Sequence, residues 1–257
     1  MLKNFPLDHA IIEEDGKIES WSTHVDQVSR LSRGMISNGI KSGDIFGILG
    51  VNSADQARLI HAGYWSGQIP MPINFRLSPE EIIQILNKTE TKSLFVSSDF
   101  LELAFKMKNY GWNGMIFGIG ENKEGVLTTT QLISNSERMS PCLSFDDDTA
   151  IILFTGGTTG EGKGVPLSHT NIISNGFQVA TALAVSRNDT FLHVAPMFHS
   201  ADLLGTAITL AGGSHSYLSQ VSPLSILDRI TNTLQTSKID AARIALNELR
   251  KYIFKYN

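Results

Sequence analysis

One stretch of the chain begins with the apolar run Ala150-Ile151-Ile152-Leu153-Phe154 and continues as Thr155-Gly156-Gly157-Thr158-Thr159-Gly160-Glu161-Gly162-Lys163-Gly164. A continuous apolar, partly β-branched run of this length is typical of a buried strand. Glycines let the backbone turn its N–H groups toward an anion, threonines add hydroxyl donors, and Lys163 adds a positive charge. The stretch therefore predicts a core strand that ends in a phosphate-binding loop. The alternative is a surface hairpin whose glycines only make turns.

Two kinds of phosphate loop fit the glycine pattern. Residues 157–163 satisfy the first seven positions of the Walker pattern G-x-x-x-x-G-K-[ST], but Gly164 stands where that pattern needs Ser or Thr. Pro166 disfavours a helical conformation at Val165 and cannot donate a backbone hydrogen bond. We therefore expect the order strand, loop, strand, with the next helix beginning near Ser168, a competent N-cap residue.

Upstream of this stretch, short apolar runs alternate with helical patterns. Strands are predicted at residues 45–49, 69–73 and 94–96, and helices at 21–39, 54–65 and from 78 onward. Ser78, Pro79 and Glu81 form the signal of a capping box. The alternation predicts an α/β fold with a parallel sheet between helices, in αβαβα layers. We expect residues 1–140 to form a first α/β subdomain and residues 141–257 a second one with the phosphate loop. Residues 109–148 show no regular pattern from which helices or strands could be assigned.

Composition and charge exclude several functional classes. The formal net charge is −4 and no long run is basic, which argues against a nucleic-acid partner. The single cysteine, Cys142, can form neither an internal disulfide nor a thiolate zinc cluster, so we expect a cytoplasmic protein. The longest apolar run, near residues 203–211, is too short to cross a bilayer. We interpret Asp146-Asp147-Asp148 as a solvated turn and expect no metal site.

The loop and its surroundings resemble the adenylate-forming superfamily, which includes acyl-CoA synthetases, aryl-CoA ligases, luciferases and nonribosomal peptide adenylation domains. Residues 154–165 followed by Ser168-His169-Thr170-Asn171 are similar to the family signature aromatic-T-S-G-T-T-G-x-P-K-G-V with its S-H pair and Asn. Three further segments are similar to family motifs: 67–81, 43–53 with its Asn52-Ser53 pair, and 195–200, which has the P-x-F-H pattern. The resemblance covers roughly residues 20 to 235.

The resemblance implies an AMP-forming ligase that activates a carboxylic acid, fatty or aryl, with ATP as an acyl-adenylate and passes the acyl group to CoA. It implies ATP, Mg²⁺ and CoA as cofactors. Lys163 and His199 are the implied catalytic residues, with His199 orienting or gating near the carboxylate. The implied nucleotide-binding residues are Thr155, Gly156, Gly157, Thr158, Thr159, Gly160 and Lys163. Gly156 replaces the commonest Ser and Gly162 the usual Pro, so we expect weakened nucleotide binding.

Several motifs that the family needs are not found in this sequence. These are the adenine segment aromatic-Gly-x-Thr-Glu, the Asp for the ribose hydroxyls, an Arg and the lysine of the C-terminal domain. We therefore expect an incomplete front half, inactive alone, that needs a C-terminal half or self-associates. Two alternatives stay open: a remnant that binds nucleotide or acyl groups or pairs with a separately encoded half, and a P-loop NTPase.

Overall fold

The computed structural model describes residues 8–121, 125–142, 147–155 and 162–233, and its largest element is a parallel five-stranded sheet. The order is β4 (Ile69–Pro72), β3 (Ile45–Leu49), β5 (Ser93–Val96), β6 (Met115–Gly118) and β7 (Leu127–Thr128). Every neighbouring pair is parallel. Strand β4 follows β3 in the sequence and lies on one side of it, whereas the next strand, β5, lies on the other side of β3. The strand order therefore reverses beside β3. In open parallel sheets, ligands bind outside the carboxyl ends of the strands at such a reversal.

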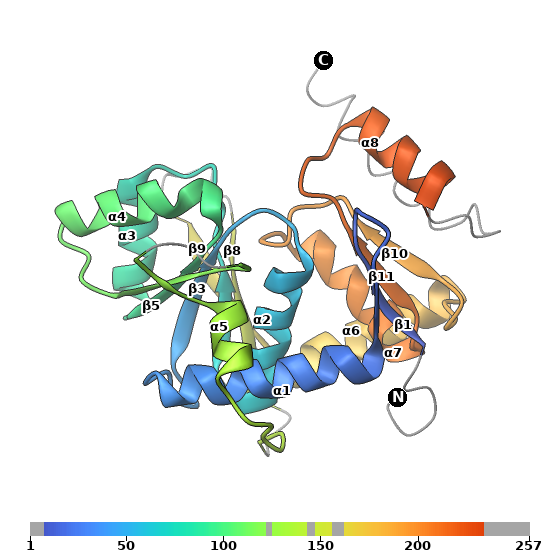
Figure 1. Cartoon of the computed structure of the whole chain (residues 1–257), viewed down its shortest axis with the longest axis horizontal. Coiled ribbons are helices and arrows are strands. Elements are labelled where there is room, and N and C mark those ends of the chain that lie inside the picture. The colour runs from blue at the N-terminus through green and yellow to red at the C-terminus, as the bar shows by residue number, and fades with distance from the viewer. Residues whose placement is uncertain (1–7, 122–124, 143–146, 156–161, 234–257) are drawn as a thin grey trace.

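Helices cover both faces of this sheet (Figure 1). The helices α1 (Trp21–Ser37), α2 (Ala54–Ser66) and α5 (Thr129–Ser134) share one apolar core with Phe46, Ile48, Phe95 and Phe117. The helices α3 (Pro79–Lys88) and α4 (Leu101–Asn109), the latter preceded by the short helix η1 (Ser98–Phe100), share the other core with Leu49, Leu94 and Val96. Alternating residues of β3 and β5 thus enter opposite cores, as the two-residue period of a strand requires. The predicted α/β fold is confirmed.

The helix starts follow the capping signals of the sequence. Ser78 accepts from the Glu81 amide and the Glu81 carboxylate accepts from the Ser78 amide, which completes the predicted capping box. Ser53 caps α2 through the Gln56 amide, and α2 ends at Gly67 with φ 74°, a left-handed conformation that favours glycine.

A four-stranded sheet forms the second part of the molecule. Its order is β10 (Thr190–His193), β11 (Ser214–Tyr217), β1 (His9–Ile12) and β2 (Ile18–Ser20). The helices α6 (His169–Ala182) and α7 (Gly205–Ala211) pack together, and η2 (Ser200–Leu204), α8 (Pro223–Asp228) and η3 (Arg229–Thr233) complete this part. Strand β1 pairs with β11 across more than two hundred residues. The division at residues 140/141 stays a prediction, and this sheet contains strands from both sides of it.

The third sheet is an antiparallel hairpin of β8 (Thr149–Thr155) and β9 (Lys163–Ser168). Ile151 and Leu153 of β8 are buried in the first core, whereas Ile152 and Phe154 pack against the second. Strand β8 also lies against β4. Its apolar run is continuous because both of its faces are covered by protein.

The segment from 109 to 148 is more regular than its sequence indicates. It contains β6, β7 and α5, and α5 begins with a capping box between Thr128 and Gln131. Within the described ranges, we find no helix with the length and apolarity that a bilayer crossing requires.

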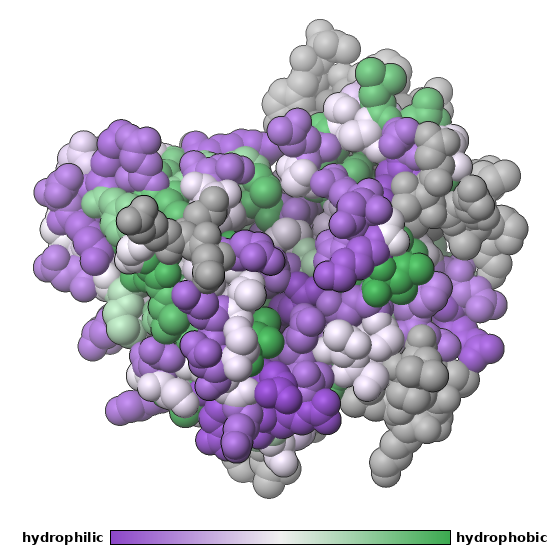
Figure 2. Space-filling view, viewed as in Figure 1, coloured by the Kyte–Doolittle hydropathy of each residue, from purple (hydrophilic) through white to green (hydrophobic). Residues whose placement is uncertain are grey.

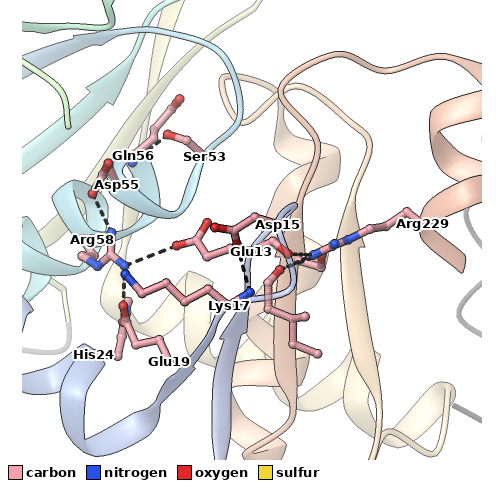
Figure 3. A network of polar contacts seen from close by, with 12 residues as sticks. Glu13, Asp15, Lys17, Glu19, His24, Ser53, Asp55, Gln56, Arg58 and Arg229 are labelled. Carbon is pink, nitrogen blue, oxygen red and sulfur yellow. Dashed lines mark hydrogen bonds and ion pairs between the residues drawn. The ribbon is translucent and has the colours of Figure 1, made fainter. Parts of the chain in front are cut away.

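A buried ion network joins the hairpin of β1 and β2 to α2 (Figure 3). Arg58 contacts the carboxylate of Glu19, that of Asp55 at 2.5 Å and that of Glu13 at 3.7 Å. Burial alone would lower the pKa of Arg58, but the three carboxylates raise it above its ordinary value. Arg229 of η3 reaches the same hairpin by donating to the Glu14 and Glu13 carbonyls at 3.2 and 2.5 Å.

Replacing Arg58 by Met is expected to lower the free energy of unfolding by about 3 kcal/mol. The reason is that Glu19, which is 8 % exposed, would keep a buried charge without its cationic partner. Urea unfolding at pH 7.5 measures the change. Lys106→Met removes an exposed ion pair with Glu102 and serves as the control, with no measurable loss expected. Equal losses in the two variants would contradict a structural role for the buried network.

Candidate functional site

The glycine-rich stretch joins two paired strands. Thr155 is the last residue of β8, Lys163 is the first residue of β9, and the two are partners in the antiparallel register. The glycine-rich stretch thus connects two antiparallel strands, as the predicted order strand, loop, strand requires. Five predicted nucleotide-binding residues, Gly156, Gly157, Thr158, Thr159 and Gly160, lie outside the described residues.

The two described ends of the loop are exposed. The Thr155 hydroxyl donates to the Lys163 carbonyl at 3.4 Å. Lys163, at the start of β9, is exposed to solvent. A Cβ at Gly162 would lie 3.1 Å from the Thr155 carbonyl, and one at Gly164 would lie 3.0 Å from the Phe154 ring. Neither glycine has a left-handed φ. Their value is steric, because a side chain would press on the Thr155 carbonyl at position 162 and on the Phe154 ring at position 164.

The geometry after Lys163 is wrong for a Walker loop. That loop needs a helix that starts at the lysine and aims its first N–H groups at the phosphates. Here Lys163 begins a strand, and α6 begins only at His169 with Ser168 as its N-cap. The alternative of a P-loop NTPase is therefore wrong.

His199 is exposed and caps the short helix η2. Its Nδ1 accepts from the Ala201 amide at 3.1 Å, and its own amide donates to the Pro196 carbonyl at 2.9 Å. The Nε2 atom has no partner in the hydrogen bonds of the described residues. Lys163 and His199 are not hydrogen-bonded to each other in that part of the chain, so their joint role stays a prediction.

An aromatic cluster supports the segment before His199. The Phe198 ring meets the Phe75 ring edge-on with centroids 5.4 Å apart, and Phe75 stacks on Phe100 at 5.5 Å. Phe75 and Phe154 pack against the same core. The end of β8, from which the glycine-rich loop starts, and the segment 195–199 are therefore both next to this core. Met197 fills the other core, with 5 % of its surface exposed.

One supporting residue was not identified from the sequence. Asn52 stands in the sequence only as part of the Asn52-Ser53 motif pair; in the structure Ser53 caps α2, and the Asn52 side chain bonds to residues 193, 195 and 197. The sequence places Asn52 and residues 195–197 in two motifs of the family that the chain resembles. The motifs alone do not show that these residues are in contact.

A first histidine pair lies between α1 and α2, with His24 buried and His61 half-buried. The Glu19 carboxylate lies 2.9 Å from His24 Nδ1, and His24 Nε2 lies 2.9 Å from His61 Nδ1. Burial lowers the pKa of His24. Burial, with repulsion from His24 and His193, lowers the pKa of His61 to about 3.

A second pair lies between β10, β11 and η2. Asp202 contacts His193 Nδ1 at 2.6 Å, and His193 Nε2 lies 3.0 Å from His215 Nδ1. Thr209 then bonds to His215 Nε2 at 3.0 Å. Burial lowers the pKa of His215 well below its ordinary value. His193 and His215 are both buried, and their partners are not indicated by the sequence.

A cavity of about 490 Å³ lies elsewhere, between α1 and α5. Arg33, Gln131, Asn135 and Glu137 are among its lining residues, and none of the predicted site residues lines it. Among the residues that the structure describes, no cluster of His, Cys, Asp and Glu could hold a metal ion.

Comparison with known proteins agrees with the motif resemblance. The family described as AMP-binding enzyme matches residues 2–243. The chain is 31% identical over 188 residues to the crotonobetaine/carnitine–CoA ligase of Salmonella agona, covering 70% of the chain and 36% of that ligase. It is 25% identical over 251 residues to the 2-succinylbenzoate–CoA ligase of Listeria monocytogenes, covering 96% of the chain and 49% of that ligase.

The fold also matches that of a solved structure. ATP-bound MatB from Rhodopseudomonas palustris superposes with a TM-score of 0.78 at 24% identity, covering 90% of this chain and 46% of that one. The chain thus spans half or less of the length of these three proteins.

The buried histidines predict that stability falls below neutral pH. An unfolded histidine titrates near 6.5, whereas the pKa of folded His61 is about 3. Between these values the unfolded chain binds a proton that the folded chain does not, so acid favours unfolding. His61 alone should cost about 2 kcal/mol at pH 5.0, because that pH is 1.5 units below its unfolded pKa.

Urea unfolding at pH 7.5 and 5.0 measures this loss. His61→Gln removes the titration and should shrink the difference between the two pH values by about 2 kcal/mol. His9→Gln, at an exposed position, should leave the difference unchanged. An equal pH dependence in the wild type and His61→Gln would contradict the assignment.

Proposed function

Because the chain belongs to the AMP-binding enzyme family, we propose that it supplies the phosphate-loop half of a carboxylate–CoA ligase. The observation that carries this proposal is the antiparallel pairing of β8 with β9, which brings together Thr155 and Lys163, the residues on either side of the Thr- and Gly-rich stretch. The relatives named above are CoA ligases. A fatty or aryl acid is the proposed substrate class.

The proposed first step joins the acid to ATP. A carboxylate oxygen forms a bond to the α-phosphorus, the bond from that phosphorus to the bridging oxygen breaks, and pyrophosphate leaves with the electron pair. Catalysis then consists mainly of alignment and charge neutralisation. Loop N–H groups, the threonine hydroxyls and the Lys163 ammonium are suited to hold the leaving phosphates. In the second step the CoA thiol attacks the acyl carbon, loses its proton and displaces AMP.

We assign His199 to the acid side of this reaction. Its exposure and its fixed Nδ1 leave Nε2 available to donate to a carboxylate oxygen. This role is orientation of the acid, and proton abstraction is not needed because the acid is already ionised at neutral pH.

Mg²⁺ enters this proposal with ATP. Magnesium in nucleotide sites is held largely by substrate phosphates and water. We therefore assign Mg²⁺ to the phosphates and derive no step from it. CoA and ATP are substrates of the proposed reaction.

Exposed apolar side chains support the proposal of a complementary half or self-association. On α6 these are Ile173 and Phe177, with Leu183 just after the helix, and on α8 they are Leu224 and Leu227. Figure 2 shows apolar surface at α8, at the upper right. Covering such groups by a second chain segment would remove them from water, which favours association.

Lys163→Ala is expected to weaken ATP binding by the chain at least tenfold, since a direct cation–phosphate contact would be lost. Isothermal titration of the chain with ATP and Mg²⁺ measures the affinity. Lys92→Ala, at an exposed position before β5 and thus at the amino edge of the sheet, is the matched control and should bind ATP as the wild type does. Undiminished binding by Lys163→Ala would remove Lys163 from the phosphate site.

The complete reaction is expected only with a complementary ligase half. Supplied with one, the chain should catalyse exchange of pyrophosphate into ATP that depends on hexanoate or benzoate, and Lys163→Ala should abolish this exchange. The chain alone should form no measurable acyl-CoA from these acids, ATP and CoA, as judged by chromatography. Acyl-CoA formation by the chain alone would refute the half-enzyme proposal. If the two-part protein exchanged pyrophosphate into ATP with neither hexanoate nor benzoate, the ligase proposal would be refuted.

A further inference from the structure

A single buried side chain ties the segment before His199 to the five-stranded sheet. Asn52 Nδ2 donates to the His193 carbonyl at 3.0 Å and to the Ala195 carbonyl at 2.7 Å. Asn52 Oδ1 accepts from the Met197 amide at 2.9 Å. Asn52 is 6 % exposed, and these partners lie more than one hundred and forty residues away in the sequence.

These bonds use both amide protons of Asn52 and its carbonyl oxygen. A buried polar side chain with every group satisfied fixes its surroundings, because any displacement leaves a buried donor or acceptor unpaired. Asn52 itself is held between the end of β3 and the capped start of α2. It is therefore a rigid anchor at the carboxyl edge of the sheet.

The segment that it holds needs such an anchor. Residues 194–199 lie between β10 and η2 and belong to neither a helix nor a strand. Pro196 has no amide proton, and Asn52 binds the backbone on both sides of it, at Ala195 and Met197. The edge-on contact of Phe198 with Phe75 holds the side chain next to His199.

We propose that Asn52 is a positioning residue of the ligase: it fixes segment 195–199 and so determines where His199 meets the carboxylate of the acid. This inference rests on the proposed function. We expect Asn52 to affect binding of the acid and not of ATP, because none of its three hydrogen bonds involves the β8–β9 hairpin. A misplacement of about 1 Å can lower a rate roughly a hundredfold.

The test compares Asn52→Ala, Asn52→Asp and Ser29→Ala in the two-part exchange assay with hexanoate and benzoate. Asn52→Asp keeps the size and the acceptor for Met197 but loses the donors to residues 193 and 195. Ser29 is the matched control, because its buried hydroxyl donates to the Met139 carbonyl at 2.9 Å and accepts from the Met139 amide at 2.8 Å, also across a long separation. Hydrogen exchange at the Met197 amide, measured on the chain itself, reports whether the anchor is lost.

Both Asn52 variants should raise the KM for the acid at least tenfold and leave the KM for ATP within twofold. Asn52→Ala should also lose protection at Met197, whereas Ser29→Ala should change stability but neither KM. An unchanged acid KM in Asn52→Ala, or equal increases for acid and ATP, would overturn the positioning role and leave the proposed function intact. Absence of acid-dependent exchange in the unsubstituted two-part protein would instead overturn the proposed function.

Discussion

The antiparallel pairing of β8 with β9 is the constraint on which the candidate site depends. Because Thr155 pairs with Lys163 and Lys163 begins β9, the lysine lies at the start of a strand and not at the start of a helix. Anion binding at a lysine in this position relies on the lysine side chain and on nearby backbone N–H groups, and a helix dipole starting at the lysine does not contribute. Strand β8 is covered on both faces, so a one-residue slip would move its apolar set between the two cores.

Buried polar contacts determine how the two parts of the molecule fit together. Apolar burial is not directional and would allow several arrangements of the four-stranded sheet against α1 and α2. Arg58 and Asn52 are more selective, because each would leave buried charges or backbone groups unpaired if the parts shifted. The two histidine pairs add to this specificity at neutral pH, where burial keeps His61 uncharged.

Local signals allowed much of this structure to be predicted from the sequence. The capping box at Ser78, the apolar face of α1 and the effect of Pro166 on the loop each depend on neighbours a few residues away. Strands β6 and β7 were not predicted, because β7 has only two residues and the apolar part of β6 is three residues between glycines. The contacts of Asn52 could not be predicted either, since they join residues whose proximity arises only from the packing of two sheets.

The candidate site separates exposed reactive groups from supports that are buried or half-buried. Lys163 and His199 are exposed, so either can contact a ligand without first breaking a packed core. Phe154, Phe75 and Asn52 lie beneath them, and their contacts reach the core of the five-stranded sheet. A substitution at an exposed position therefore changes ligand contacts with little effect on folding, whereas one beneath it changes both. The two layers need different measurements, because loss of activity alone does not distinguish a residue that touches the ligand from one that holds such a residue in place.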